Sequence, residues 1–212
     1  MPPPTAPPTP TPFQHHFPNA LVWLRLVLAS VFVAILAVAD TASSSLLLLA
    51  AAIFSLAALT DTLDGHLARR WRVVSRFGRV MDPFADKVLI LGAFVMLAGP
   101  AFTREQGIDL GYPASGVHPW MAVVILAREL LVTSLRALVE GEGGDFSADW
   151  AGKIKMIVQS IAVPIILLTL AWGRWSPGEP GRTVIDIAAW TTVVVTLASG
   201  IPYLLHLLRR RA

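Results

Sequence analysis

The sequence predicts an all-α integral membrane protein, built as a bundle of six transmembrane helices. Of its 212 residues, 55% are hydrophobic and only 15% are charged, and the mean hydropathy is +0.64. Long apolar runs recur along the chain, with short polar segments between them. One span takes roughly 20 residues, so six spans would use about 120, which this chain can supply. The composition therefore excludes a soluble multidomain enzyme.

The first 18 residues differ from the rest, because they hold eight of the 16 prolines. Proline lacks the amide hydrogen that a helix needs, so we expect residues 1–18 to form a disordered, proline-rich tail. A basic segment followed directly by an apolar run and a cleavage site is missing here, so we expect no cleaved signal peptide.

Six apolar runs follow, and each break between them is rich in Gly, Pro, Ser or charged residues, as helix ends are. The predicted helices are Leu21–Ala39, Leu46–Leu67, Val80–Ala98, Trp120–Val139, Ile154–Trp172 and Val184–Leu208. No repeat and no second domain boundary is visible. We expect one six-helix domain at 19–208 and a basic C-terminal tail at 209–212.

The basic residues predict the orientation, because loops on the cytoplasmic side of a membrane carry an excess of Lys and Arg. Ten basic residues fall on one side of the predicted bundle and three on the other. The ten are Arg69, Arg70, Arg72, Arg76, Arg79, Lys153, Lys155, Arg209, Arg210 and Arg211. We expect both termini in the cytoplasm.

Four aspartates lie inside or beside the second and third apolar runs, where charge is costly. Asp61 and Asp64 are three residues apart and share a helix face, and Asp82 and Asp86 are four apart and share another. The short connection between these helices predicts that the four carboxylates converge near the cytoplasmic end of the bundle. This end would hold the active site.

Four converging carboxylates repel one another and need a compensating positive charge. The chain contains no cysteine, so an all-oxygen site favours Mg²⁺ or Mn²⁺, with Ca²⁺ as an alternative, over zinc or copper. Two ions are plausible with four carboxylates, an arrangement suited to phosphoryl displacement. Gly65, Ala68 and Gly78 lie one helical turn from these acids and leave room for a bulky ligand.

The residues from Asp61 to Asp86 fit the spacing D-x2-D-G-x2-A-R-x8-G-x3-D-x3-D without a mismatch. This segment resembles the signature of the CDP-alcohol phosphatidyltransferases. The resemblance implies a six-helix membrane enzyme that moves a phosphatidyl group from CDP-diacylglycerol to an alcohol and releases CMP. It implies metal binding by Asp61, Asp64, Asp82 and Asp86, with Asp86 also the catalytic base. The residues it implies for CDP-diacylglycerol binding are Asn19, Asp61, Thr62, Gly65, Ala68, Arg69 and Gly78.

The resemblance as a whole covers residues 18–160. Its segments outside the signature point to sn-glycerol 3-phosphate as the acceptor. The matching segments are Pro18-Asn19, Arg25, Arg128-Glu129, Thr133 to Arg136, Gly152-Lys153-x-Lys155 and Gln159. The acceptor's phosphate would be bound by Arg128, Arg136, Lys153 and Lys155. The product would be phosphatidylglycerophosphate.

Simpler interpretations exist for these outer residues. Arg128 and Arg136 could pair with Glu129 and Glu140, and the two lysines could be membrane anchors. Asn19 and Arg25 could cap the first helix or contact lipid headgroups.

Other functions also stay open at this stage. The same chemistry could serve inositol phosphate, serine or phosphatidylglycerol as acceptor, and a cation-coupled transporter is the alternative from another class. We expect a multi-pass protein of the inner membrane that contacts membrane lipid and no nucleic acid. A homodimer is left open.

Overall fold

The computed structural model describes residues 12–71, 76–105, 108–109, 111–141, 150–203 and 205. Within this part of the chain the fold is all-α with six long helices, as predicted. These are α1 (Pro12–Val38), α2 (Ser44–Trp71), α3 (Arg76–Leu97), α4 (Pro119–Gly141), α5 (Trp150–Ala171) and α6 (Pro180–Ala198). A short 3-10 helix η1 (Pro100–Phe102) and a small antiparallel pair, β1 (Arg104–Glu105) and β2 (Ile108–Asp109), follow α3.

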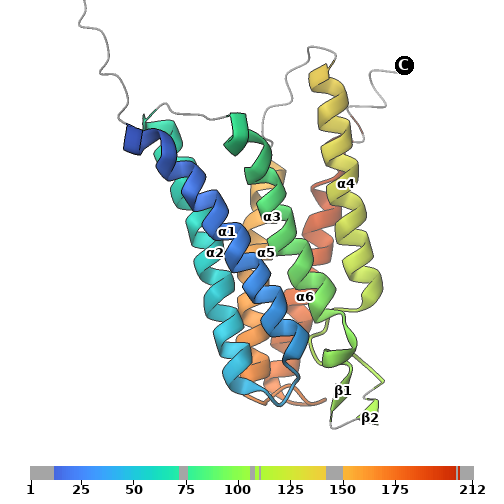
Figure 1. The fold of residues 1–212 in the computed structure, drawn as a ribbon. Coiled ribbons are helices and arrows are strands. Elements are labelled where there is room, and N and C mark those ends of the chain that lie inside the picture. Colours follow the sequence, from blue (N-terminus) through green and yellow to red (C-terminus); the bar gives the residue numbers. More distant parts are fainter. Residues whose placement is uncertain are drawn as a thin grey trace, which may run out of the picture.

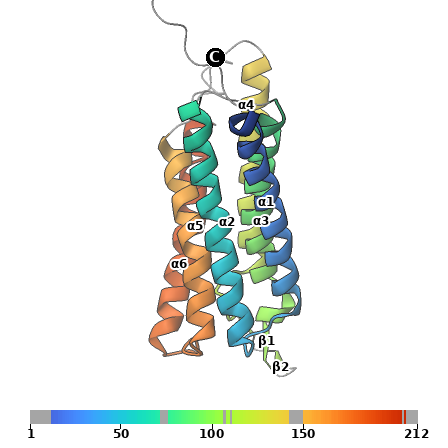
Figure 2. The ribbon, with the colours of Figure 1, turned by 60° about the vertical axis from the view of Figure 1, so that its left-hand side comes forward.

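The helices lie roughly parallel to one axis and form a single bundle (Figure 1). Packing contacts give the order around the bundle as α1, α2, α5, α6, α4 and α3. Figure 2 shows α2, α5 and α6 on one side and α1, α3 and α4 on the other. α1 therefore lies between α2 and α3, which contact each other only slightly. The two helices that carry the predicted metal ligands thus each pack mainly against α1.

Four helical segments are long and apolar enough to cross a membrane: Asn19–Val38, Ser44–Asp61, Trp150–Ala171 and Pro180–Tyr203. This agrees with a multi-pass membrane protein. α3 and α4 do not meet the same criterion within the described residues. Both helices are long, but α3 contains Asp82, Asp86 and Lys87, and α4 contains Arg128 and Glu129. Charges reduce their apolarity, and several of these charged residues belong to the candidate site described below.

The hydrophobic core includes buried residues of all six helices. Phe32, Phe54 and Phe94 are almost completely buried, and the ring centroids of Phe32 and Phe54 are 5.3 Å apart. In a membrane, helices associate through van der Waals packing rather than the hydrophobic effect, so close contacts of this kind stabilise the bundle. This core holds α2 and α3, which carry the predicted metal ligands, in a fixed position against α1.

One end of the bundle is closed by the loop of residues 111–118, near β1 and β2 in Figure 1. The Ser115 hydroxyl donates to the Leu97 carbonyl at 2.6 Å, and Arg182 Nη1 donates to the Pro113 carbonyl at 2.9 Å. Gly116 has a φ of 67°, and a Cβ placed there would lie 2.7 Å from Ile185 Cγ2. Glycine is required at this position by both conformation and space.

The start of the first helix differs from the expectation. α1 begins at Pro12, inside the segment predicted to be a disordered tail, whereas residues 1–11 lie outside the described part. Proline is tolerated at the first helical position because that amide has no intrahelical partner. The residues between Pro12 and Pro18 contain no proline, so they can continue the helix.

The end of the sixth helix also differs. The sequence predicts helix through Leu208, but α6 ends at Ala198 with Ser199 as its C-cap. Gly200 follows, and residues 201–203 return to helical geometry. Pro202 has no amide hydrogen to donate to the carbonyl four residues earlier, which favours a break here. The break leaves the Ser199 carbonyl available to a side chain of α4.

Candidate active site

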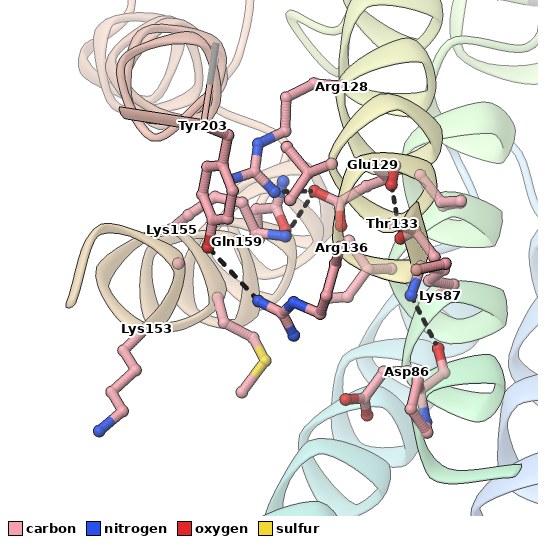
Figure 3. Close-up of a pocket in the computed structure, with 17 residues that line it drawn as sticks. Asp86, Lys87, Arg128, Glu129, Thr133, Arg136, Lys153, Lys155, Gln159 and Tyr203 are labelled. Carbon is pink, nitrogen blue, oxygen red and sulfur yellow. Dashed lines mark hydrogen bonds and ion pairs between the residues drawn. The ribbon is translucent and has the colours of Figure 1, made fainter. Parts of the chain in front are cut away.

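A cavity of about 550 Å³ lies among α3, α4 and α5, with Tyr203 contributing from the segment after α6. Its polar lining residues, labelled in Figure 3, are Asp86, Lys87, Arg128, Glu129, Thr133, Arg136, Lys153, Lys155, Gln159 and Tyr203. Five of these are basic and two are acidic. The cavity is therefore strongly basic and complementary to an anionic ligand.

Glu129 organises the basic residues at one part of this cavity. Its Oε1 accepts from Lys155 Nζ at 2.5 Å and from Arg128 Nη1 at 3.1 Å. All three residues are buried, with at most 9% of each residue exposed. A carboxylate between two buried cations reduces their mutual repulsion and limits their orientations.

Two further contacts hold Arg128 in place. Its Nη2 donates to the Ser199 carbonyl at 3.0 Å, and its guanidinium lies 5.7 Å from the centre of the Tyr203 ring. The break at the end of α6 thus supplies a carbonyl to the arginine of α4. Tyr203 also accepts from Arg136 Nη2, at 3.4 Å.

Gln159 completes the buried polar group on the α5 side. It is fully buried, and its Nε2 donates to the Thr196 hydroxyl of α6 at 3.0 Å. Its Oε1 is buried without a hydrogen-bond partner in the described structure. An acceptor oxygen of this kind, at the cavity wall, is suited to a ligand hydroxyl.

Asp86 lies at another part of the cavity, and Figure 3 shows Arg136 between it and the group around Glu129. Lys87 follows Asp86 on α3, and its Nζ donates to the Pro83 carbonyl at 3.3 Å. Lys153 is exposed at the rim, with Nζ 5.7 Å from the centre of the Trp150 ring. The cavity thus extends from a carboxylate on α3 to cations on α4 and α5.

Behind Asp86, the fully buried Arg25 of α1 connects three helices. Its Nη1 lies 2.7 Å from Asp61 Oδ1 on α2 and 3.1 Å from Asp86 Oδ1 on α3. Because both oxygens contact the same nitrogen, these two carboxylates lie close together although α2 and α3 pack little against each other. The side chains of Asp61 and Asp86 are 26% and 31% exposed, so both remain reachable.

Residues 15–198 match the family profile of the CDP-alcohol phosphatidyltransferases. The chain belongs to the CDP-alcohol phosphatidyltransferase family. The profile covers most of the chain and includes all six helices apart from the first residues of α1. The resemblance drawn from the sequence is confirmed, and membership of a transferase family excludes the transporter alternative.

Several relatives share most of their length with this phosphatidyltransferase. A protein of Bacillus subtilis strain 168 named CDP-diacylglycerol–glycerol-3-phosphate 3-phosphatidyltransferase is 34% identical over 198 residues, covering 89% of this chain and 93% of that protein. A Mycobacterium tuberculosis H37Rv protein named probable phosphatidylglycerophosphate synthase is 35% identical over 192 residues, covering 90% and 81%. An Escherichia coli K12 protein with the same name as the Bacillus one is 32% identical over 201 residues, covering 90% and 94%.

The predicted acceptor residues of this phosphatidyltransferase come together. Arg128, Arg136, Lys153 and Lys155 all line the one cavity, although they come from two helices. The alternative interpretation also holds in part, since Arg128 pairs with Glu129. Asn19 lies near the start of α1 and is half-buried.

Of the predicted metal ligands, only Asp61 and Asp86 have described side chains, and Arg25 lies between them. The remaining predicted side chains lie outside the described part: Thr62, Asp64, Gly65, Ala68, Arg69, Gly78 and Asp82. Among the side chains that the structure does describe, no three acidic or histidine residues gather as a metal site.

Five residues without a predicted site role reach the site in the structure: Arg25, Lys87, Glu129, Gln159 and Tyr203. Three of them, Arg25, Glu129 and Gln159, lie in the segments that resemble the family. The sequence could have predicted a role for Arg25 and Glu129, because a charged residue inside an apolar helix indicates a charged partner nearby. Tyr203 carried no such signal, because its position depends on the break after α6.

Proposed function

We propose that this phosphatidyltransferase transfers a phosphatidyl group from CDP-diacylglycerol to sn-glycerol 3-phosphate and releases CMP. The product is phosphatidylglycerophosphate. The observation that carries this proposal is the basic cavity that begins at Asp86 and extends to Arg128, Arg136 and Lys155. A phosphorylated acceptor would complement these charges, whereas an uncharged alcohol would leave them unused. The names of the Bacillus and Escherichia relatives support the same acceptor.

In the proposed reaction, a hydroxyl of glycerol 3-phosphate attacks the phosphorus that bears the diacylglycerol. A new phosphorus–oxygen bond forms to the acceptor, and the bond from that phosphorus to the oxygen bridging to CMP breaks. Asp86 takes the proton of the attacking hydroxyl. For that role its carboxylate must come within hydrogen-bond reach of the bound acceptor, and it borders the cavity as the role requires.

The acceptor's phosphate is bound by Arg128, Arg136, Lys153 and Lys155. Arginine suits paired contacts to phosphate oxygens, and lysine supplies a point charge. Glu129 holds Arg128 and Lys155 toward one another, so these two cations are already ordered before the acceptor arrives. Ordering the charges in advance reduces the entropy lost on binding.

CDP-diacylglycerol is bound by the residues that the family resemblance supplies, namely Asn19, Asp61, Thr62, Gly65, Ala68, Arg69 and Gly78. This half of the proposal rests on the motif and on family membership. The small residues would admit the nucleotide close to the helix backbone.

Asp61, Asp64, Asp82 and Asp86 would hold divalent cations, Mg²⁺ or Mn²⁺, with two ions in the proposed site. The described residues fit such a group, because oxygens of Asp61 and Asp86 already converge on one positive centre and carboxylate oxygens are the ligands that these ions prefer. When bound, the ions would offset the charge of the diphosphate during displacement.

We further propose that all six helices span the inner membrane, with both termini and the active site on the cytoplasmic side. The excess of basic residues at one end of the bundle supports this orientation. Some of the charged residues of α3 and α4 line the cavity rather than face lipid, namely Asp86, Arg128 and Glu129. The 19–208 segment would form one catalytic domain.

The test is CMP release by the purified full-length protein supplied with CDP-diacylglycerol and one acceptor at a time. The acceptors are glycerol 3-phosphate, inositol phosphate, serine and phosphatidylglycerol, each with Mg²⁺, Mn²⁺ or excess chelator. We expect release with glycerol 3-phosphate and either metal, and none in chelator. Preference for an uncharged acceptor would refute the acceptor assignment, and full activity in chelator would refute the metal site.

Variants of the four aspartates complete this test. Asp61→Asn, Asp64→Asn, Asp82→Asn and Asp86→Asn should each lose CMP release. If Asp86 acts mainly as the base, Asp86→Asn should still bind CDP-diacylglycerol with metal. Loss of binding in that variant would show that its main role is as a ligand.

A further inference from the structure

Arg25 is the side chain whose placement the proposed reaction leaves unexplained. It is fully buried in α1, within a segment apolar enough to span a membrane. Burying a guanidinium is unfavourable unless charged partners compensate it. Its described partners include Asp61 at 2.7 Å and Asp86 at 3.1 Å, two of the four residues proposed to hold metal.

The same two carboxylates cannot serve a guanidinium and a divalent cation without cost. A positive charge a few ångströms from a metal site repels the metal and occupies ligand oxygens that the metal needs. Conversely, without any cation these half-buried carboxylates would repel each other. A guanidinium at this position stabilises the metal-free site and opposes metal binding.

We propose that Arg25 is an internal competitor of the metal. In the metal-free enzyme its guanidinium holds Asp61 and Asp86 together, and metal binding has to displace it from at least one of them. Arg25 thereby keeps the ligands of α2 and α3 assembled while lowering the metal affinity of the enzyme. This inference rests on the proposed metal site and assigns Arg25 a positioning role that acts through Asp61 and Asp86.

The test measures Mn²⁺ binding to the full-length protein. The electron paramagnetic resonance signal of free Mn²⁺ reports how much of the ion remains unbound. Arg25→Gln removes the charge, and Arg25→Lys keeps a charge on a shorter side chain. Removing a positive charge that lies a few ångströms from a metal site should increase the affinity for the ion by about tenfold or more. We expect Arg25→Gln to bind Mn²⁺ at least about tenfold more tightly than wild type, and Arg25→Lys to remain close to wild type.

Thermal unfolding provides a second readout on the same proteins. Without metal, Arg25→Gln should unfold at a lower temperature than wild type, because its carboxylates lose their counter-charge. Added Mn²⁺ should raise its unfolding temperature by more than it raises that of wild type. Arg182→Gln is the matched control, because it removes another arginine–aspartate pair, with Asp186, near the closed end of the bundle. That variant should lose stability without any change in Mn²⁺ affinity.

The outcomes separate this inference from the proposed function. If wild type binds no Mn²⁺, the metal site itself is wrong and the inference falls with it. If wild type binds Mn²⁺ but Arg25→Gln binds it equally or more weakly, the metal site stands and the competition is refuted. Should Arg25→Gln fail to fold, the structure of Mn²⁺-loaded wild type decides. Persistence of both ion pairs of Arg25 beside bound metal would overturn the proposal, and loss of one would support it.

Discussion

Lys155 Nζ on α5 lies 2.5 Å from Glu129 Oε1 on α4, although the two residues are 26 positions apart in the chain. The same oxygen accepts from Arg128. This pair connects the two helices that supply the proposed acceptor site. Glu129 thereby places a negative charge inside a cavity whose other charges suit an anion. We infer that the role of Glu129 is to order Lys155 and Arg128.

Breaking this pair should be costly. Glu129→Ala leaves Lys155 and Arg128 buried without their counter-charge, and we expect the free energy of unfolding to fall by about 3–5 kcal/mol. The double variant Glu129→Ala with Lys155→Met should recover part of this loss. Equilibrium unfolding in detergent of wild type, Glu129→Ala, Lys155→Met and the double variant measures the interaction free energy between the two side chains. Strictly additive losses would mean that the two side chains do not stabilise each other.

Arg136 tests the acceptor site through kinetics. Losing one charged phosphate contact costs roughly 1.5–3 kcal/mol, so Arg136→Ala should lower kcat/KM for glycerol 3-phosphate by about 10- to 150-fold. Arg128→Ala and Lys153→Ala should act in the same direction. The KM for CDP-diacylglycerol should stay unchanged.

Tyr203→Phe is the matched control for Arg136, because it removes only the hydroxyl that accepts from Arg136. Its effect on the acceptor should be much smaller. Wild-type acceptor kinetics in all three basic variants would place the phosphate pocket elsewhere.

Gly65 tests whether the small residues of the motif give room to the nucleotide. Gly65→Leu should abolish binding of CDP-diacylglycerol, because the added side chain would occupy the space next to Asp61 and Asp64. Close helix packing is the competing explanation for small residues in membrane helices. Binding of labelled CDP-diacylglycerol to the purified variant measures the effect. A folded variant with normal binding would contradict the proposed clearance.

Gly116 tests the closed end of the bundle. Gly116→Ala introduces a Cβ 2.7 Å from Ile185 Cγ2 at a φ of 67°, so we expect a loss of about 1–3 kcal/mol in the free energy of unfolding. Gly111→Ala has the same φ but open space around its Cβ, and it isolates the conformational part of the cost. Thermal unfolding of both variants should rank Gly116→Ala as clearly less stable. Equal losses would show that contact with Ile185 does not matter.

Much of the architecture could be predicted from the sequence, because each helix is encoded locally. Apolar runs with Gly, Pro and polar breaks predicted six helices, and six were found in the described part of the chain. The errors are at the ends, as at Pro12 and after Ala198. Helix ends depend on single hydrogen bonds that packing can add or remove.

The candidate site could be predicted only in part. Residue type and spacing predicted the acidic motif and the basic residues of α4 and α5 as site residues, because the chemistry of a site depends on which functional groups are present. From the sequence, Glu129 belonged to a segment that matches the family and was an alternative partner for Arg128, but its contact with Lys155 was not predicted. Such a shared contact requires α4 and α5 to be placed in space.

The sequence by itself determined the fold class, the family and the set of carboxylates and cations available for catalysis. These follow from local hydropathy and from spacing within single helices. Tertiary structure alone decided that Asp61 and Asp86 meet at Arg25, a residue 61 positions from Asp86. The physical reason is that α1 packs between α2 and α3, so an ion pair between these helices forms only where helix packing brings their backbones together.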